Sequence, residues 1–210
     1  MGDSLNLFGD DRAFEQIALP DADIRLMRRF YDVQQADRNF AGLLRDTPWR
    51  ADTIKVWGKE HPQPRLTAWY GDAGADYTYS GLRMAPLPWS DALAKIKAEV
   101  EAVCDARFNS VLINLYRDER DSVGWHSDDE PELGPAPLIA SLSLGATRTF
   151  RLKHKKRPHD KAAGIALTHG SLLLMGGDTQ RCWSHAVDKE RQPAAPRINL
   201  TFRTIYRAGT

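Results

Sequence analysis

The spacing of apolar residues predicts two helices in the first half of the chain. Residues 21–45 place apolar side chains on one face at helical spacing, namely Ile24, Met27 and Tyr31, and Asp21 or Asp23 can cap the first turn. Ser90 can cap a second helix that runs to about Asp105. The buried face of this second helix is predicted to consist of Leu93, Ile96, Val100 and Val103.

From Asn109 onward the pattern changes to short apolar runs that are separated by Gly, Pro or charged turns. The runs predicted as strands cover residues 111–116, 138–144, 147–153, 164–168, 171–175, 183–187 and 198–206. Many short strands at this spacing are typical of a sandwich or barrel, and two preceding helices would pack on one outer face. The sequence therefore predicts an α+β domain without internal repeats.

Length and composition agree with a single domain. The chain has 210 residues, of which 42% are hydrophobic. Residues 1–20 are polar and acidic, which predicts an extended arm or partly ordered tail. Residues 21–210 would then form the domain, with its barrel in residues 109–206.

No apolar run approaches the roughly 18 residues that a membrane helix needs, and the first residues do not form a basic, apolar signal sequence. We therefore expect no membrane partner and a cytoplasmic or nuclear location. The two cysteines, Cys104 and Cys182, fit a reducing compartment and lack metal-site spacing.

The net charge of +1 argues, on its own, against a strong nucleic-acid binder. The charge is unevenly distributed, however. Residues 1–24 carry six acids against Arg12 alone, and residues 148–161 hold seven Lys or Arg against one Asp. This basic segment can neutralise phosphates and give salt-dependent affinity; a hairpin kept soluble by its charge is the alternative interpretation.

The candidate chemistry lies on two histidines and one aspartate. His126-Ser-Asp128 places an imidazole and a carboxylate two residues apart, and His185 follows far downstream. Two imidazoles and one carboxylate can occupy one face of a metal and leave the opposite positions open, as in non-haem Fe(II) oxygenases. Because an H-x-D pair is common by chance, this prediction depends on the residues that accompany it.

Arg197 and Arg203 follow His185 at 12 and 18 residues. Because they lie six positions apart, both side chains leave the same face of a regular strand, where they could hold an acidic co-substrate by bidentate pairing. Asn114-Leu-Tyr116 lies just upstream of the first metal pair. Without the two arginines, Asn114 and Tyr116 would be interpreted as a satisfied polar pair on a buried strand.

These residues resemble the AlkB family of Fe(II)/2-oxoglutarate dioxygenases. The resemblance covers residues 54–206 and is carried by Asn114-x-Tyr116, His126-x-Asp128, His185 and Arg197-Ile-Asn-Leu-Thr201-Phe-Arg203. It is greatest for the branch that repairs alkylated bases in duplex DNA. The segments that indicate this branch are Val56-Trp57-Gly58-Lys59, Pro64-Arg65, Tyr70-Gly-Asp72-Ala-Gly74 and Tyr77-Thr-Tyr79-Ser80-Gly81.

The resemblance implies a double-stranded β-helix, which is a jelly-roll barrel, and a site within it. Fe(II) would be bound by His126, Asp128 and His185, and the distal carboxylate of 2-oxoglutarate by Arg197. The residues that would complete the co-substrate pocket are Asn114, Tyr116, Thr201 and Arg203. Arg203 is also a candidate for positioning groups around the oxidised methyl. O₂ would be the second co-substrate, with ascorbate as reductant in vitro.

The implied reaction is oxidative removal of N-alkyl groups from bases such as 1-methyladenine and 3-methylcytosine in DNA, with release of succinate, CO₂ and an aldehyde. The target base must be flipped out of the stack to be reached. Contacts to DNA would come from recognition hairpins in residues 52–82 and from the segment after the metal carboxylate. The residues concerned are Trp57, Gly58, Lys59, Arg65, Tyr77, Tyr79, Asp129 and Glu130.

Within this set, Tyr77 and Tyr79 match the lid of the base pocket, and Asp129 and Glu130 match positions that contact the base or its backbone. A carboxylate near the base would suit cationic lesions; an acidic surface loop is the alternative. We expect a monomer. Two other functions stay open: a 2-oxoglutarate oxygenase acting on RNA or protein, and a non-enzymatic jelly-roll module in which the triad holds a structural ion.

Trp57 is predicted at the tip of a hairpin. Residues 53–57 alternate like a strand, and Pro62 and Pro64 close the loop that follows. An aromatic side chain at this tip can fill the gap left by a flipped base, and duplex-repair members of the family usually carry Phe there. A strand aromatic that packs on the early helix is the alternative interpretation.

Trp57→Ala is expected to reduce demethylation of duplex DNA far more than demethylation of single-stranded DNA, because only a duplex has a gap to fill. The comparison needs one methylated oligonucleotide in both forms, assayed with the wild-type and variant proteins. An equal loss on the two forms would end the wedge interpretation.

Overall fold

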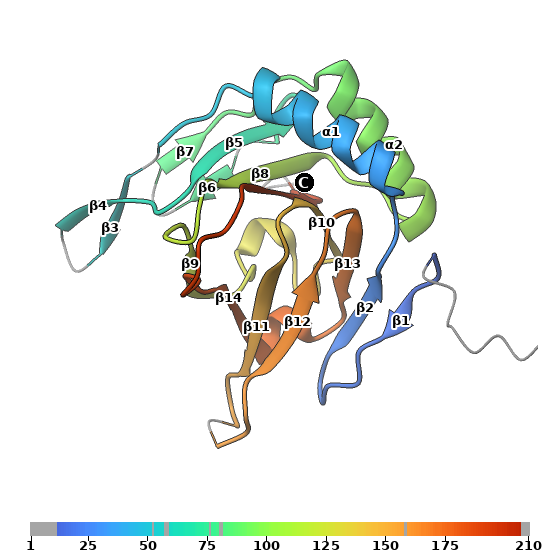
Figure 1. Cartoon of the computed structure of the whole chain (residues 1–210). Coiled ribbons are helices and arrows are strands. Elements are labelled where there is room, and N and C mark those ends of the chain that lie inside the picture. The colour runs from blue at the N-terminus through green and yellow to red at the C-terminus, as the bar shows by residue number, and fades with distance from the viewer. Residues whose placement is uncertain are drawn as a thin grey trace, which may run out of the picture.

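The computed structural model describes residues 12–51, 53–56, 59–75, 77–79, 82–157 and 159–206. Within them, two antiparallel sheets form the body of the molecule (Figure 1). The larger sheet has the order β1-β2-β13-β10-β15-β8-β5. Its strands are β1 Glu15–Gln16, β2 Asp23–Met27, β13 Ser171–Gly176, β10 Ile139–Gly145, β15 Arg197–Arg203, β8 Ser110–Tyr116 and β5 Leu66–Gly71.

The smaller sheet has the order β12-β11-β14-β9. Its strands are β12 Ala163–Leu167, β11 Arg148–His154, β14 Trp183–Val187 and β9 Val123–His126. The two sheets pack face to face, since one apolar cluster takes Leu173 from the larger sheet together with Phe150 and Trp183 from the smaller. This arrangement confirms the predicted jelly-roll barrel.

Two helices cover the outer face of the larger sheet, α1 (Val33–Asp46) and α2 (Asp91–Cys104) (Figure 1). Ser90 caps α2 as predicted, because its hydroxyl accepts a hydrogen bond from the Leu93 N–H at 3.3 Å. Val103 is 41% exposed, contrary to prediction, and the neighbouring Cys104 packs on the core instead. No helix among the described residues is long and apolar enough to cross a membrane.

The first predicted helix was placed too early. Residues 23–27 form strand β2, which pairs with β13, and α1 begins only after Asp32, whose carboxylate accepts from the Gln35 N–H at 2.8 Å. The segment Asp23-Ile-Arg-Leu also alternates polar and apolar, with a period of two. Ile24 and Leu26 enter the core between the sheets, and a sheet partner decides between the two patterns.

Most predicted strands of the barrel are confirmed to within one or two residues, but β1, β5 and β9 were missed, in addition to β2. All but the first residue of β5 are buried, so its sequence does not alternate. β9 is only four residues long and contains Gly124. The last strand ends at Arg203 rather than at residue 206.

Two hairpins lie apart from the barrel sheets, between α1 and α2 in the sequence. β3 (Thr53–Val56) pairs with β4 (Lys59–Pro62), and β6 (Tyr77–Tyr79) pairs with β7 (Leu82–Met84). The first projects from the body of the molecule at the left of Figure 1. The hairpin predicted around Trp57 is thus confirmed, whereas Trp57 and Gly58 lie outside the described residues.

Glu101 links the end of α2 to the start of the barrel. Its carboxylate is buried and accepts from the Phe108 N–H at 2.7 Å, and it pairs with Lys97 at 3.0 Å and Arg107 at 3.1 Å. Burial alone would raise the pKa of Glu101, but these three partners lower it below its ordinary 4.5.

Glu101→Gln is expected to lower the free energy of unfolding by about 1 kcal/mol at neutral pH, because an amide keeps the bond to the Phe108 N–H but loses both ion pairs. A group whose pKa falls on folding stabilises the fold above its unfolded pKa and loses that contribution in acid. Urea titrations should therefore show the difference between the two proteins shrinking as the pH falls below 4.5. A constant difference down to low pH would contradict this role for the Glu101 charge.

Candidate active site

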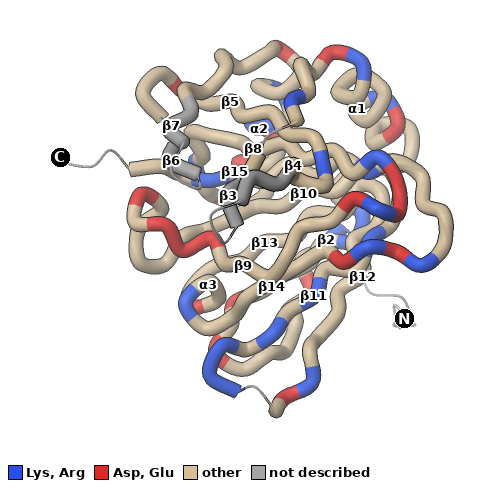
Figure 2. The backbone as a smooth tube through the Cα atoms, turned by 90° about the vertical axis from the view of Figure 1, so that its left-hand side faces the viewer, with Lys and Arg blue, Asp and Glu red and all other residues tan. Residues whose placement is uncertain are grey.

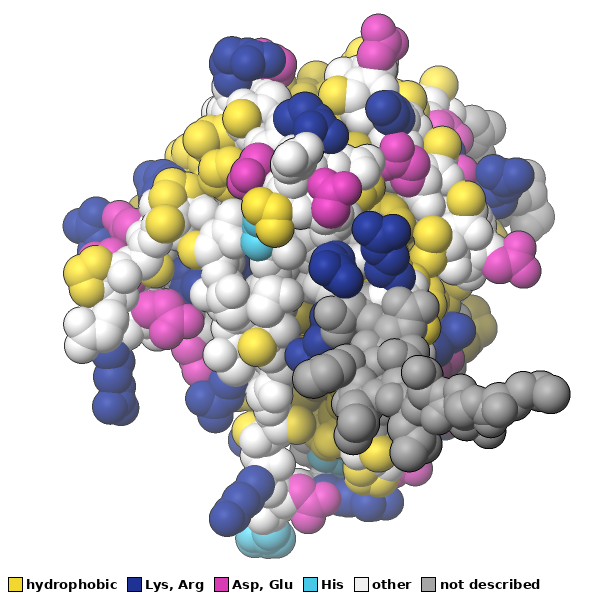
Figure 3. All heavy atoms as spheres, turned by 45° about the vertical axis from the view of Figure 1, so that its right-hand side comes forward, with side chains coloured by type: hydrophobic (Ala, Val, Ile, Leu, Met, Phe, Trp, Pro, Cys, Tyr) yellow, Lys and Arg dark blue, Asp and Glu magenta, His cyan; other side chains and the backbone are white. Residues whose placement is uncertain are grey.

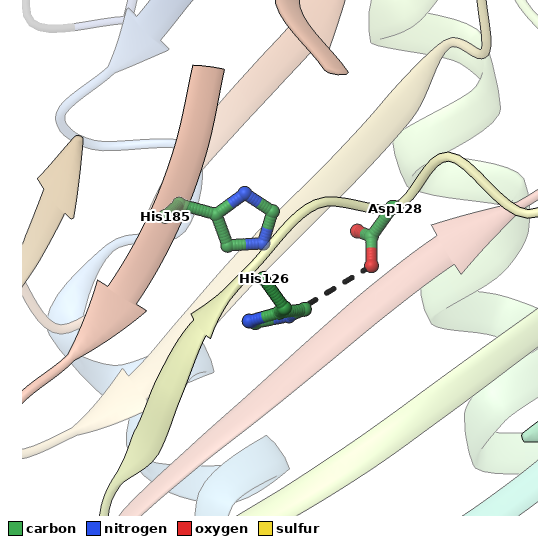
Figure 4. A group of neighbouring side chains, drawn as sticks. All are labelled: His126, Asp128 and His185. Carbon is green, nitrogen blue, oxygen red and sulfur yellow. Dashed lines mark ion pairs between the residues drawn. The ribbon is translucent and has the colours of Figure 1, made fainter. Parts of the chain in front are cut away.

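His126, Asp128 and His185 come together at one end of the space between the sheets (Figure 4). One ligand atom from each lies within 4.8 Å of the others, and His126 Nε2 lies 3.9 Å from Asp128 Oδ1. The strand ladder places the two histidines, because His126 at the end of β9 is the register partner of His185 in β14. Asp128 lies two residues beyond the end of β9.

The protonation of this triad suits a divalent metal. His126 Nδ1 lies 2.8 Å from the Gly124 carbonyl, which can only accept, so Nδ1 carries a hydrogen and Nε2 is the nitrogen that would bind a metal. Burial lowers the pKa of His185 to about 3, which keeps the imidazole neutral. Burial alone would raise the pKa of Asp128, but Arg203 and the two histidines lower it to about 2. Two imidazoles and one carboxylate are a ligand set that fits Fe(II).

Arg203 is the ion-pair partner of the metal-site carboxylate. Its Nη2 lies 2.7 Å from Asp128 Oδ1, and both side chains are buried. A buried carboxylate without a cation would be costly. Arg203 therefore keeps Asp128 ionised and fixes one of its oxygens.

A cavity extends from the triad between the two sheets, and all the predicted co-substrate residues line it. Its lining residues are Arg65, Leu112, Asn114, Tyr116, Val123, His126, Asp128, Ser141, Phe150, Leu167, Met175, His185, Val187, Arg197, Asn199, Thr201 and Arg203. Six polar lining residues lie on strands of the larger sheet, namely Asn114, Ser141, Arg197, Asn199, Thr201 and Arg203. Most of the apolar lining comes from β9, β11, β12, β13 and β14.

Arg197 is a buried cation in this cavity, and its hydrogen bonds are only partly satisfied. It is 1% exposed, and its Nη2 donates to Ser143 Oγ at 2.9 Å. Among the described residues, its buried Nε and Nη1 have no hydrogen-bond partner. Burial lowers the pKa of the Arg197 guanidinium, and the Tyr116 ring centre lies 5.1 Å from its Cζ. The N–H groups of Nε and Nη1 can donate to a carboxylate, which is the group at the far end of 2-oxoglutarate.

Other polar residues of the lining are bonded to one another. Arg65 donates through Nε to Asn114 Oδ1 at 2.8 Å, so it lies in the cavity wall beside the co-substrate residues. Thr201 donates to Asn199 Oδ1 at 3.0 Å, and Asn199 donates to Ser141 Oγ at 2.8 Å. Asn199 and Ser141 were not predicted as site residues. The signal for Asn199 was present, because it lies at even spacing between Arg197 and Thr201.

Within the described part of the chain, most side chains that were predicted to contact the substrate are not part of this cavity lining. The Asp129 carboxylate pairs with Lys155 Nζ at 2.8 Å, and neither Asp129 nor Glu130 belongs to the cavity lining. Lys59 lies on β4, and Tyr77 and Tyr79 lie on β6, with side chains outside the described part of the chain. Their predicted contacts with DNA stay predictions, as do those of Trp57 and Gly58.

Comparison with known proteins agrees with this geometry. The sequence profile of the 2OG-Fe(II) oxygenase superfamily matches residues 23–203. Alpha-ketoglutarate-dependent dioxygenase alkB homolog 3 of Bos taurus is 49% identical over 84% of this chain and 64% of its own length. DNA oxidative demethylase ALKBH2 of Mus musculus is 42% identical over 84% of this chain and 73% of its own length.

A solved structure supports the fold independently. The structure of OsALKBH1 superposes with a TM-score of 0.63 at 18% identity, covering 91% of this chain and all of that one. The chain spans about two thirds of the length of the curated relatives that it matches, 64% for the bovine protein. With the profile match over most of its length and relatives above 40% identity, the chain belongs to the AlkB family of Fe(II)/2-oxoglutarate dioxygenases.

Proposed function

We propose that this protein removes alkyl groups oxidatively from N-alkylated bases, such as 1-methyladenine and 3-methylcytosine, in DNA. The observation that carries the proposal is a single cavity that holds both the His126–Asp128–His185 triad and the unsatisfied guanidinium of Arg197. One cavity thus holds three ligands for one face of a metal and a cation that can bind a carboxylate. This combination suits an oxygenase that consumes a keto diacid. The names of the two relatives, a dioxygenase and a DNA oxidative demethylase, support the same chemistry.

When bound, Fe(II) and 2-oxoglutarate would together activate O₂, which is the oxidant of the reaction. The protein's part is to hold and shield them. His126, Asp128 and His185 would bind the metal through one face, and Arg197 would bind the distal carboxylate. Phe150 stacks on the His185 ring with centroids 4.9 Å apart and so covers one side of the metal site from water.

The charged surface gives weaker support for DNA than the sequence alone suggested. Basic residues gather along β11 and the turn after it (Figure 2). However, Arg148 is buried, Lys155 pairs with Asp129, and Arg157 pairs with Asp21. On the face shown in Figure 3, basic and acidic side chains are mixed. Recognition of DNA therefore rests mainly on the two hairpins and on base flipping, with the basic segment adding phosphate contacts.

The test is a comparison of substrates under identical conditions. Oligonucleotides that carry 1-methyladenine or 3-methylcytosine are supplied as single-stranded DNA, duplex DNA and RNA, with a methylated peptide as a fourth substrate. Repaired base and succinate are quantified by mass spectrometry, with 2-oxoglutarate omitted as control. Repair of DNA is expected; turnover of RNA or peptide alone would replace DNA as the substrate, and no succinate at all would refute the enzyme. We also propose that the protein is a monomer, and that residues 1–20 form an arm outside the domain of residues 21–210.

Arg197→Met is expected to weaken 2-oxoglutarate binding by roughly 100-fold or more, because a buried, charge-assisted pair contributes several kcal/mol to binding once its partner is desolvated. Binding of Co(II), which probes the triad alone, should remain within about threefold of wild type. Titration calorimetry of both ligands measures the two effects. Arg151→Met on the exposed outer face of β11 is the matched control, and unchanged 2-oxoglutarate affinity in Arg197→Met would contradict the clamp.

A further inference from the structure

The three members of the triad are not held in the same way. His126 and His185 lie on paired strands, where the ladder fixes their backbone. Asp128 follows β9 in a stretch without regular structure, so no strand partner holds it. Its carboxylate is bonded by Arg203, but a side-chain contact alone does not determine where the backbone places the carboxylate.

Gln180 holds the backbone of Asp128. Its Oε1 accepts a hydrogen bond from the Asp128 N–H at 3.0 Å, and its Nε2 faces Met175 Sδ at 3.6 Å. Gln180 is 2% exposed, so this bond is shielded from water. In the described part of the chain, the hydrogen bonds of the Gln180 side chain go to Asp128 and Met175, which both line the cavity.

The position of Gln180 in the chain connects it to the third ligand. It lies in the short helix α3 (Thr179–Cys182), which leads directly into β14 and His185. Two more contacts bind the same segments together: Ser127 Oγ donates to the Trp183 carbonyl at 2.9 Å, and Lys155 Nζ donates to the Gln180 carbonyl at 2.8 Å. Thus α3 is connected by the chain to His185 and by hydrogen bonds to the segment that carries Asp128.

We propose that Gln180 is a positioning residue of the metal centre, which sets the place of the Asp128 carboxylate through its backbone N–H. This inference rests on the proposed metal site. Loss of the bond leaves a buried N–H without a partner and frees the segment after β9 to rotate. The carboxylate then leaves the position that the ladder-held histidines require. Groups that only orient a metal ligand typically change metal affinity by about 10–100-fold when removed.

The experiment compares three substitutions in the full chain. Gln180→Met keeps the volume but removes the oxygen acceptor, and Gln180→Glu keeps an acceptor at the same reach. Thr179→Val is the matched control. Thr179 is equally buried on the same helix turn, but its hydroxyl bonds Gly176 and Asp23 of the larger sheet and does not contact the segment after β9.

The readouts are the Co(II) dissociation constant by calorimetry and the melting temperature of the metal-free protein. Gln180→Met is expected to bind Co(II) about tenfold more weakly than wild type, and Gln180→Glu to recover most of that loss. Thr179→Val is expected to melt at lower temperature with unchanged Co(II) affinity. Should Gln180→Met not fold, Gln180→Asn, which is one methylene too short to reach Asp128, takes its place.

Equal Co(II) affinity in wild type and Gln180→Met would overturn the inference, as would an equal loss of affinity in Thr179→Val. Neither result concerns the substrate, so demethylation can succeed while the inference fails. Wild-type protein that binds no Co(II) would instead remove the metal centre on which the proposed function depends.

Discussion

Strand β15 is the element on which both the core and the site depend. It lies between β10 and β8, all seven of its residues are buried, and its register with β8 runs unbroken from Arg197 opposite Tyr116 to Arg203 opposite Ser110. Its apolar face packs toward the helices through Ile198, Leu200 and Phe202, and its polar face lines the cavity. A slip of one residue would exchange the two faces. The ladder that builds the core therefore also fixes the site.

The barrel buries several charges, and they are neutralised to different extents. Arg148 is surrounded by the carbonyls of Asp118, Asp121 and Asp188 and by the Glu190 carboxylate. Arg203 has Asp128. Arg197, in contrast, keeps two buried nitrogens without a partner among the described residues. Because an incompletely paired buried cation destabilises a fold, a dicarboxylate that satisfies it would stabilise the protein as it binds.

Short apolar runs predicted a sandwich or barrel, and His126-x-Asp128, His185 and the two late arginines predicted the metal and co-substrate site. The resemblance to the AlkB family supplied the jelly roll and the individual roles of the pocket residues. The even spacing from Arg197 to Arg203 needs only a regular strand to bring both arginines to one face. The first helix was misplaced because Asp23-Ile-Arg-Leu-Met fits both periods, and its partner β13 lies more than 140 positions away. Gln180 could not be predicted, since its role arises from a turn of helix that meets a loop distant in the sequence.

The residues proposed to select the substrate lie on other elements than the metal and co-substrate residues. The metal and co-substrate residues lie on or next to barrel strands. In the described part of the chain β8, β14 and β15 are paired on both sides, and β9 is paired with β14. The two hairpins, for which we propose contacts with DNA, lie between the helices in sequence and form two small sheets of their own. Their described residues make no ladder bonds to the barrel. Side chains on those hairpins can therefore change without disturbing the register that places His126 and His185. This is why residues of the barrel indicate the class of reaction, whereas the proposed choice of nucleic acid would depend on side chains of the hairpins.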